Sequence, residues 1–187
     1  MRIAFGLSQT LVDVEEAGLD FSLKFRPGAV DLLRMLKLDG HTLILWTSKK
    51  RNSFNTIRRK AEELFGFFEE IYCKEDFDLL ENIPGCSLHI FKNVNKINAD
   101  CLIESKESYK KYSNILQMDH KYLIVDKYRE FLFDEPTKWQ IKVVGDGIVE
   151  KREKRRREKE YWVLDVYEFV ENLKKNRLEA SQDNIVQ

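Results

Sequence analysis

The sequence has few of the residues that mark a disulfide-bonded or membrane-spanning protein. Only three of its 187 residues are cysteine, and an odd number at unmatched spacing argues against a disulfide framework and favours a reducing compartment. No apolar run approaches the roughly 20 residues that a membrane span needs. We therefore expect a cytoplasmic protein without a signal peptide, or a nuclear protein if the source is a eukaryote.

The chain also lacks net charge and the common nucleotide-binding motifs. The 32 basic residues are balanced by 32 acidic residues, so there is no overall field to attract nucleic acid or anionic lipid. The three histidines show no spacing typical of a catalytic triad or a metal site. No phosphate-binding glycine motif is present, which gives ATP and NAD no support. Any basic surface must therefore be local.

The residues that are present predict a single α/β domain over residues 1–187. Residues 3–5 and 42–46 are short apolar runs typical of buried parallel strands, and each is followed by a segment with helical spacing. The first helix follows Pro27 and ends at Gly40, and the second begins at Asn52 or Ser53. Because ligands of such sheets bind beyond the carboxyl ends of the strands, we expect a site at residues 6–10 and 47–48.

The remaining segments are predicted with less regular patterns. Residues 13–20 are acidic and typical of a turn, and residues 70–73 form a third strand. Residues 74–106 are interpreted as a small insert, residues 106–116 as a helix, and residues 122–125 as a fourth core strand that ends at Asp126. A further strand is expected near residues 140–144. The last helix is predicted to be capped by Asp165, with a frayed tail at residues 180–187.

Four short segments together resemble a known superfamily. They are Gly-Leu-Ser-Gln-Thr at residues 6–10, Ile-Leu-Trp-Thr-Ser at residues 44–48, Lys110, and Ile-Val-Asp at residues 124–126. This ordered set resembles the haloacid dehalogenase (HAD) superfamily, most closely its small C-terminal-domain phosphatase branch, also called NLI-interacting-factor-like. The resemblance implies a three-layer Rossmannoid fold, in which a parallel sheet is flanked by helices, with one small insert.

The resemblance also implies a role for each matched position. The family opens with Asp-x-Asp-x-Thr, in which the first carboxylate attacks phosphorus and the second is the general acid and base. Gly6 and Ser8 stand at these two positions. By the same resemblance, the phosphate-binding residues are Thr10, Thr47, Ser48 and Lys110, and Asp126 is a weak candidate for the magnesium ligand that follows the fourth strand.

These replacements remove the chemistry that the family needs. Glycine cannot form a phosphoaspartate, and a serine hydroxyl is a poor acid or base near neutral pH without an activating partner. Magnesium usually needs one or two carboxylates, and of the family's metal-binding acids only Asp126 remains. We therefore expect no cofactor, with magnesium as the alternative.

Three functions remain open. The leading hypothesis is a catalytically degenerate phosphatase-like domain, not itself an enzyme, that binds a protein partner, a phosphorylated ligand or nucleic acid. The first alternative is an active magnesium-dependent HAD phosphatase that uses substitute acids. The second alternative is a structural subunit of a larger assembly. Substitute acids would come from Asp13, Glu15, Glu16 or Asp146.

A basic segment at residues 150–160 precedes the last predicted helix. Its cationic side chains would contact nucleic acid or an acidic partner. Acidic residues at helical spacing within the segment favour a different interpretation, a solvated helix with local ion pairs. The residues concerned are Arg152, Lys154, Arg155, Arg156 and Arg157.

Overall fold

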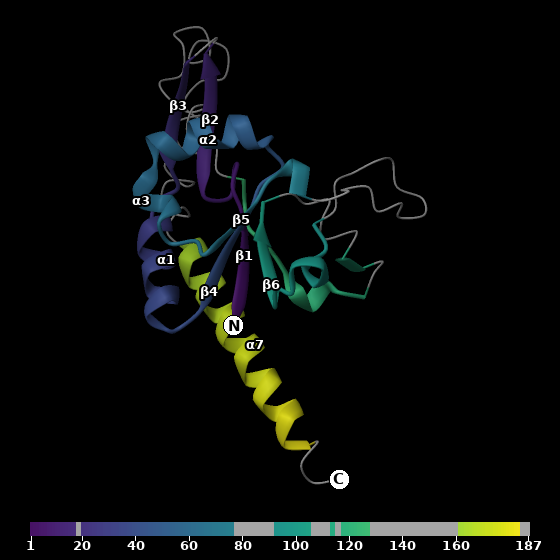
Figure 1. Cartoon of the computed structure of the whole chain (residues 1–187). Coiled ribbons are helices and arrows are strands. Elements are labelled where there is room, and N and C mark those ends of the chain that lie inside the picture. Colours follow the sequence, from purple (N-terminus) through teal and green to yellow (C-terminus); the bar gives the residue numbers. More distant parts are fainter. Residues whose placement is uncertain (18–19, 77–91, 106–112, 115–116, 128–160, 184–187) are drawn as a thin grey trace, which may run out of the picture.

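The computed structural model describes residues 1–17, 20–76, 92–105, 113–114, 117–127 and 161–183. Its centre is a sheet of five strands in which all neighbouring pairs are parallel (Figure 1). The strand order is β5-β4-β1-β6-β7. The strands are β1 (Arg2–Gly6), β4 (Thr42–Trp46), β5 (Glu70–Tyr72), β6 (Cys101–Glu104) and β7 (Tyr122–Ile124).

Alternation along β1 places its apolar side chains on both faces of the sheet. Ile3 and Phe5 belong to the larger hydrophobic core, together with residues of the helices. Ala4 points to the opposite face, into a second core that includes Val94 and Ile97. A strand covered on both faces needs apolar residues at every position, which explains the unbroken apolar run in the sequence.

Four helices of the described part of the chain contribute to the larger core. They are α1 (Ala29–Leu38), α2 (Arg51–Lys60), α3 (Glu62–Phe65) and the long α7 (Tyr161–Asp183). The second face carries the 3₁₀ helix η2 (Val94–Ile97); η1 (Lys74–Asp76) and η3 (Asp119–Lys121) are two further short turns. The predicted fold class, an α/β domain built on a parallel sheet flanked by helices, is confirmed.

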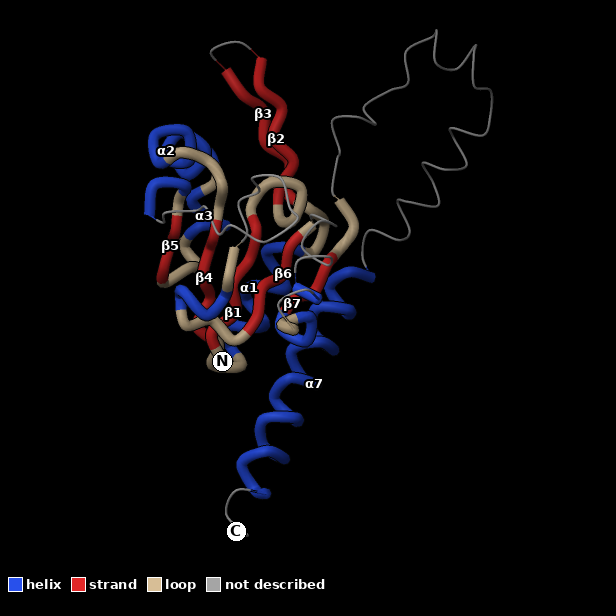
Figure 2. Tube along the Cα trace, turned by 90° about the vertical axis from the view of Figure 1, so that its right-hand side faces the viewer, coloured by secondary structure: helices blue, strands red, loops and turns tan. Residues whose placement is uncertain are grey.

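The acidic segment after β1 is a β-hairpin and not the turn that we expected. Strands β2 (Val12–Ala17) and β3 (Asp20–Phe25) pair antiparallel and project from the carboxyl edge of the main sheet (Figure 2). The register pairs Val12 with Phe25 and Val14 with Leu23. Alternation of these apolar residues with Asp13 and Lys24 is a strand pattern, and the acidic content obscured it.

Several predicted boundaries also need correction. Strand β6 lies within the predicted insert of residues 74–106, so β7 is the fifth strand of the parallel sheet and not the fourth. Helix α2 begins at Arg51, before both predicted caps, and Asp165 lies inside α7. The predicted strand at residues 140–144 and most of the predicted helix at residues 106–116 lie outside the described residues.

Helix α7 is held against the amino end of α1 by specific contacts. The indole Nε1 of Trp162 donates to the carbonyl oxygen of Pro27 at 2.9 Å. The Arg26 guanidinium lies 4.4 Å from the centre of the Trp162 ring, a cation–π geometry. Val166 and Val170 are buried in the larger core. Beyond these contacts the helix extends past the sheet (Figure 1).

No helix in the described part of the chain combines the length and apolar character needed to cross a membrane.

The close approach of α7 to Gly28 yields a stability prediction. Gly28 has φ +76°, and a Cβ there would lie 2.8 Å from Val163 Cγ2. Gly40 has nearly the same φ, +77°, with open space around it. We expect Gly40→Ala to cost about 1 kcal/mol from backbone strain, and Gly28→Ala to cost about 1–3 kcal/mol more from the contact with Val163. Urea unfolding measures both; equal losses would contradict the close packing.

An ion pair at the amino edge of the sheet yields a pH prediction. Arg2 on β1 pairs with Glu70 on β5 at 2.7 Å, and the hydrogen bond from Arg2 is the main reason that the pKa of Glu70 is lowered. A lowered folded-state pKa stabilises the protein above the ordinary value of 4.5 and loses that contribution as the pH falls further. Because both side chains are partly exposed, we expect Glu70→Gln to cost less than about 1 kcal/mol at pH 7.

Unfolding at pH 7 and at pH 3 tests this prediction. The difference between the natural chain and Glu70→Gln should shrink at pH 3, because below 4.5 the unfolded state takes up a proton more readily than the folded state, whose pKa is lowered. A difference that is the same at both pH values would show that Glu70 acts through packing instead.

Candidate functional site

The candidate site lies where β1 ends at the carboxyl edge of the sheet. Gly6 is buried, and the next residues form a tight turn in which the N–H groups of Leu11 and Val12 both donate to the Leu7 carbonyl, at 3.0 and 3.2 Å. Gln9, at the tip, has φ +65°. The turn returns the chain directly into the β2–β3 hairpin. Residues 6–10, which carry the predicted resemblance, therefore form a hydrogen-bonded turn.

The space next to Gly6 is filled by a side chain from the neighbouring strand. A Cβ built on Gly6 would lie 2.6 Å from each carboxylate oxygen of Glu104 and 2.7 Å from its Cδ. Glu104 is the last residue of β6, which pairs with β1. No side chain larger than hydrogen fits at Gly6 while Glu104 keeps this position. The space beside the end of β1 is therefore occupied by a carboxylate from β6.

Three donors among the described residues hold Glu104 in place. Lys92 Nζ lies 2.5 Å from Oε2, and both side chains are almost completely buried, at 3% and 2% exposure. Thr10 Oγ1 and the Ser105 N–H each donate to Oε1 at 3.0 Å. The pair is electrically neutral as a unit, and each charge is compensated, which is the condition for burying charges at moderate cost.

The structure brings some predicted phosphate-binding residues to this edge. Thr10 is fully buried, and its hydroxyl is engaged with Glu104. Thr47 is 2% exposed, and its Oγ1 accepts from the Lys49 N–H at 3.1 Å. Ser8 and Ser48 are half-buried. The two threonine hydroxyls thus make contacts within the protein, and the two serines line the accessible part of the edge.

Other predicted site residues lie outside the described residues. They are Lys110 and the basic residues Arg152, Lys154, Arg155, Arg156 and Arg157. Their roles stay predictions.

Asp126 does not occupy the position from which its metal-binding role was inferred. It is exposed and follows β7, which is separated from β1 by β6. Its carbonyl oxygen accepts from Arg26 Nη1 at 2.8 Å. The end of the fourth parallel strand in chain order is instead Glu104. The strand count was wrong because residues 101–104 were included in the insert.

Lys92 and Glu104 are the site residues that sequence reasoning missed. The apolar run of residues 101–103 followed by an acid is a strand signal that could have identified Glu104. Lys92 precedes η2 in a segment without regular periodicity, and its burial depends on a partner 12 residues away. No local pattern predicts that contact.

The donor set does not suit magnesium. The ion prefers octahedral oxygen coordination with one or two carboxylates. Among the described residues at this edge, the buried carboxylate of Glu104 is already paired with the Lys92 ammonium. A dication would have to displace that ammonium from a buried position. We therefore find no fit for a magnesium site at Glu104.

Comparisons with known proteins give a limited result. No protein-family model and no curated protein sequence matches the chain. Among solved structures, the chain is similar to a protein from Thermotoga maritima described as a beta-phosphoglucomutase, at 16% identity and a TM-score of 0.41. The match covers 60% of this chain and 53% of that protein, so this chain spans about half of its length.

The buried pair yields a prediction for folding stability. Removing one partner takes away the 2.5 Å contact that compensates the other buried charge, so we expect Lys92→Met and Glu104→Gln each to destabilise the fold, Lys92→Met by about 3–5 kcal/mol. The double variant should lose clearly less than the sum of the two, because neither charge then remains. A double-mutant cycle by urea unfolding measures the coupling; additive losses would show that the two side chains do not act as a pair.

Proposed function

We propose that this chain is a catalytically degenerate relative of the HAD phosphatases, closest to the small C-terminal-domain phosphatase branch, and that it acts by binding. The observation that carries this proposal is the Glu104 carboxylate in the space that a side chain at Gly6 would need. The residue at the nucleophile position is a glycine without a side chain, and the Glu104 carboxylate occupies the space where a side chain would lie.

Glu104 is a poor substitute for the missing nucleophile. It is 1% exposed, and its two oxygens accept from Thr10, Ser105 and Lys92. An attacking carboxylate needs an open lone pair directed at phosphorus and a path for the substrate. A carboxylate held by three donors in the interior satisfies neither condition. This argues against the alternative of an active phosphatase that uses substitute residues.

Lys92 takes the place that a metal ion would have beside the Glu104 carboxylate. Its ammonium supplies positive charge next to the carboxylate, which is the electrostatic role that a cation has beside buried acids. The family chemistry needs that cation to contact the phosphoryl group as well. Because the buried Lys92 ammonium is paired with Glu104, it leaves no position for a cation that contacts both the carboxylate and a phosphoryl group. The proposal therefore includes no magnesium.

The accessible surface at this edge favours an anionic partner. Residues 49–60 contain six basic residues and no acidic residue, in a chain whose total charge is zero. Lys50, Arg58 and Arg59 are exposed, and the loop that carries Thr47 and Ser48 leads directly into this helix. A phosphorylated protein segment would bring negative charge to both features. A fixed subunit role would instead require a partner that stays bound through purification.

Hydrolysis of a generic aryl phosphate, with and without magnesium, tests the proposal on three chains. The natural chain should be inactive. The variant Gly6→Asp, Ser8→Asp should also be inactive, because the new side chain at position 6 meets Glu104. Adding Glu104→Asp shortens the obstructing side chain and keeps an acid at the end of the fourth strand, so the triple variant should gain magnesium-dependent turnover.

Two controls make the outcome clear. The triple variant with Ala in place of the new residue at position 6 should be inactive, because it lacks the nucleophile. Enzymatic turnover by the natural chain that is lost in Glu104→Gln would overturn the proposal and identify Glu104 as a working catalytic group.

A further inference from the structure

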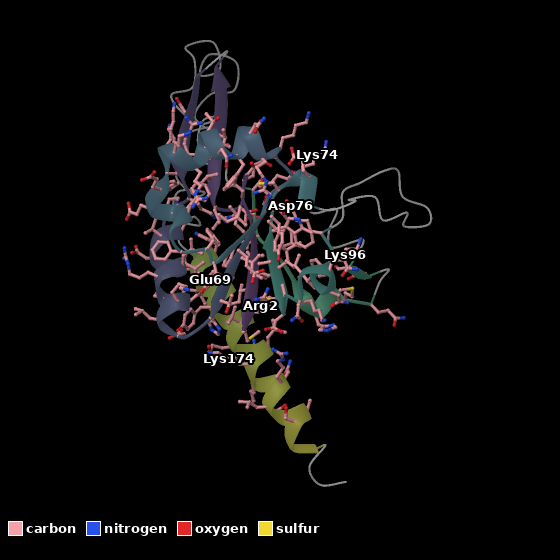
Figure 3. The ribbon with its side chains drawn as sticks, in the orientation of Figure 1. Arg2, Glu69, Lys74, Asp76, Lys96 and Lys174 are labelled. Atoms are coloured by element: carbon pink, nitrogen blue, oxygen red, sulfur yellow. The ribbon has the colours of Figure 1, made fainter. Side chains whose placement is uncertain are left out.

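A second cluster of ionisable side chains lies at the opposite edge of the sheet from Gly6. It joins the C-cap of α1 (Asp39), the residue before β4 (His41) and the middle of α7 (Glu171). One ring nitrogen of His41 and one carboxylate oxygen from each acid lie within 4.8 Å of one another. In Figure 3, Lys174 of α7 marks this edge, with Arg2 and Glu69 nearby.

His41 has an unsatisfied nitrogen in this cluster. Its side chain is buried, with 3% exposure, and its Nδ1 lies 3.3 Å from the amino group of Met1. Nε2 is buried without a hydrogen-bond partner among the described residues. A buried polar atom without a partner has lost its hydrogen bonds to water and gained none in return. The imidazole is therefore held through Nδ1, while Nε2 has no hydrogen-bond partner among the described residues.

Each carboxylate also keeps one oxygen available. Tyr167 donates to Asp39 Oδ2, and Lys174 pairs with Glu171 Oε1 at 2.6 Å. In the described part of the chain, no contact is found for Asp39 Oδ1 or Glu171 Oε2. Three donor atoms, one nitrogen and two oxygens, thus converge from three parts of the chain. Such a set suits zinc, and it leaves a fourth position for water.

We propose that Asp39, His41 through Nε2, and Glu171 form a binding site for a divalent ion of the zinc class. Imidazole favours zinc, cobalt and nickel over magnesium or calcium, which prefer oxygen alone. Tyr167 contacts Asp39 Oδ2 and Lys174 contacts Glu171 Oε1. These contacts orient the other oxygen of each carboxylate toward the centre of the cluster. The ion ties α7 to the connection between α1 and β4.

Two positive groups face the same cluster and set the strength of binding. They are the Lys174 ammonium and the Met1 amino group. Each opposes a dication, so the site is weaker than one with carboxylates alone. Removing Lys174 should therefore tighten binding of the ion, although it also removes an ion pair with Glu171.

Titration of the full, untagged chain with zinc, and with cobalt as a spectroscopic probe, tests the site. We expect one equivalent to bind, with a tetrahedral cobalt absorption band and a higher melting temperature. Glu171→Gln, an exposed change on a helix surface, should weaken binding about tenfold or more. Asp39→Asn and His41→Gln should do the same, and Lys174→Gln should tighten binding.

Two controls separate this site from other metal-binding groups. His120→Ala removes an exposed histidine and should leave binding unchanged. The double variant Cys86→Ser, His89→Ala removes the other pair of metal-ligating residue types and should also leave it unchanged. No binding by the natural chain, equal binding by Glu171→Gln, or loss only in the cysteine–histidine double variant would overturn the proposal. Its outcome is independent of phosphate hydrolysis.

Discussion

The rest of the candidate site depends on one buried ion pair, Lys92 with Glu104. Two charges with at most 3% exposure are tolerated only because each compensates the other and further donors satisfy the carboxylate. This pair fixes what can stand at Gly6, engages the hydroxyl of Thr10, and ties the segment before η2 to the edge of the sheet. The geometry around the end of β1 follows from it.

The pair also bears on the proposal that this chain lacks the phosphatase reaction. A reactive carboxylate at the end of β1 would be one more buried negative charge, and it would need a cation from solution. Here the carboxylate comes from β6 and the cation from Lys92, both within the chain. The proposed metal site lies at the other edge of the sheet, with different residues.

Much of the fold was predictable because its information is local. The apolar runs of β1 and β4, the helical spacing of α1 and the order of the elements specify a parallel α/β sheet. The hairpin and β6 were missed because acidic residues in one and a run of four residues in the other weaken the pattern. The absence of carboxylates at positions 6 and 8 was visible in the sequence. The groups that fill the space were not, because the contact between Lys92 and Glu104 depends on tertiary structure.

Arg26 links the two parts that project from the domain. Its backbone N–H donates to Leu11 at the base of the hairpin, at 2.8 Å, and its guanidinium donates to the carbonyls of Thr10 and Asp126 while lying against Trp162. The base of the hairpin and the start of α7 therefore contact the same side chain. Any change at Arg26 alters the surroundings of both projections at once.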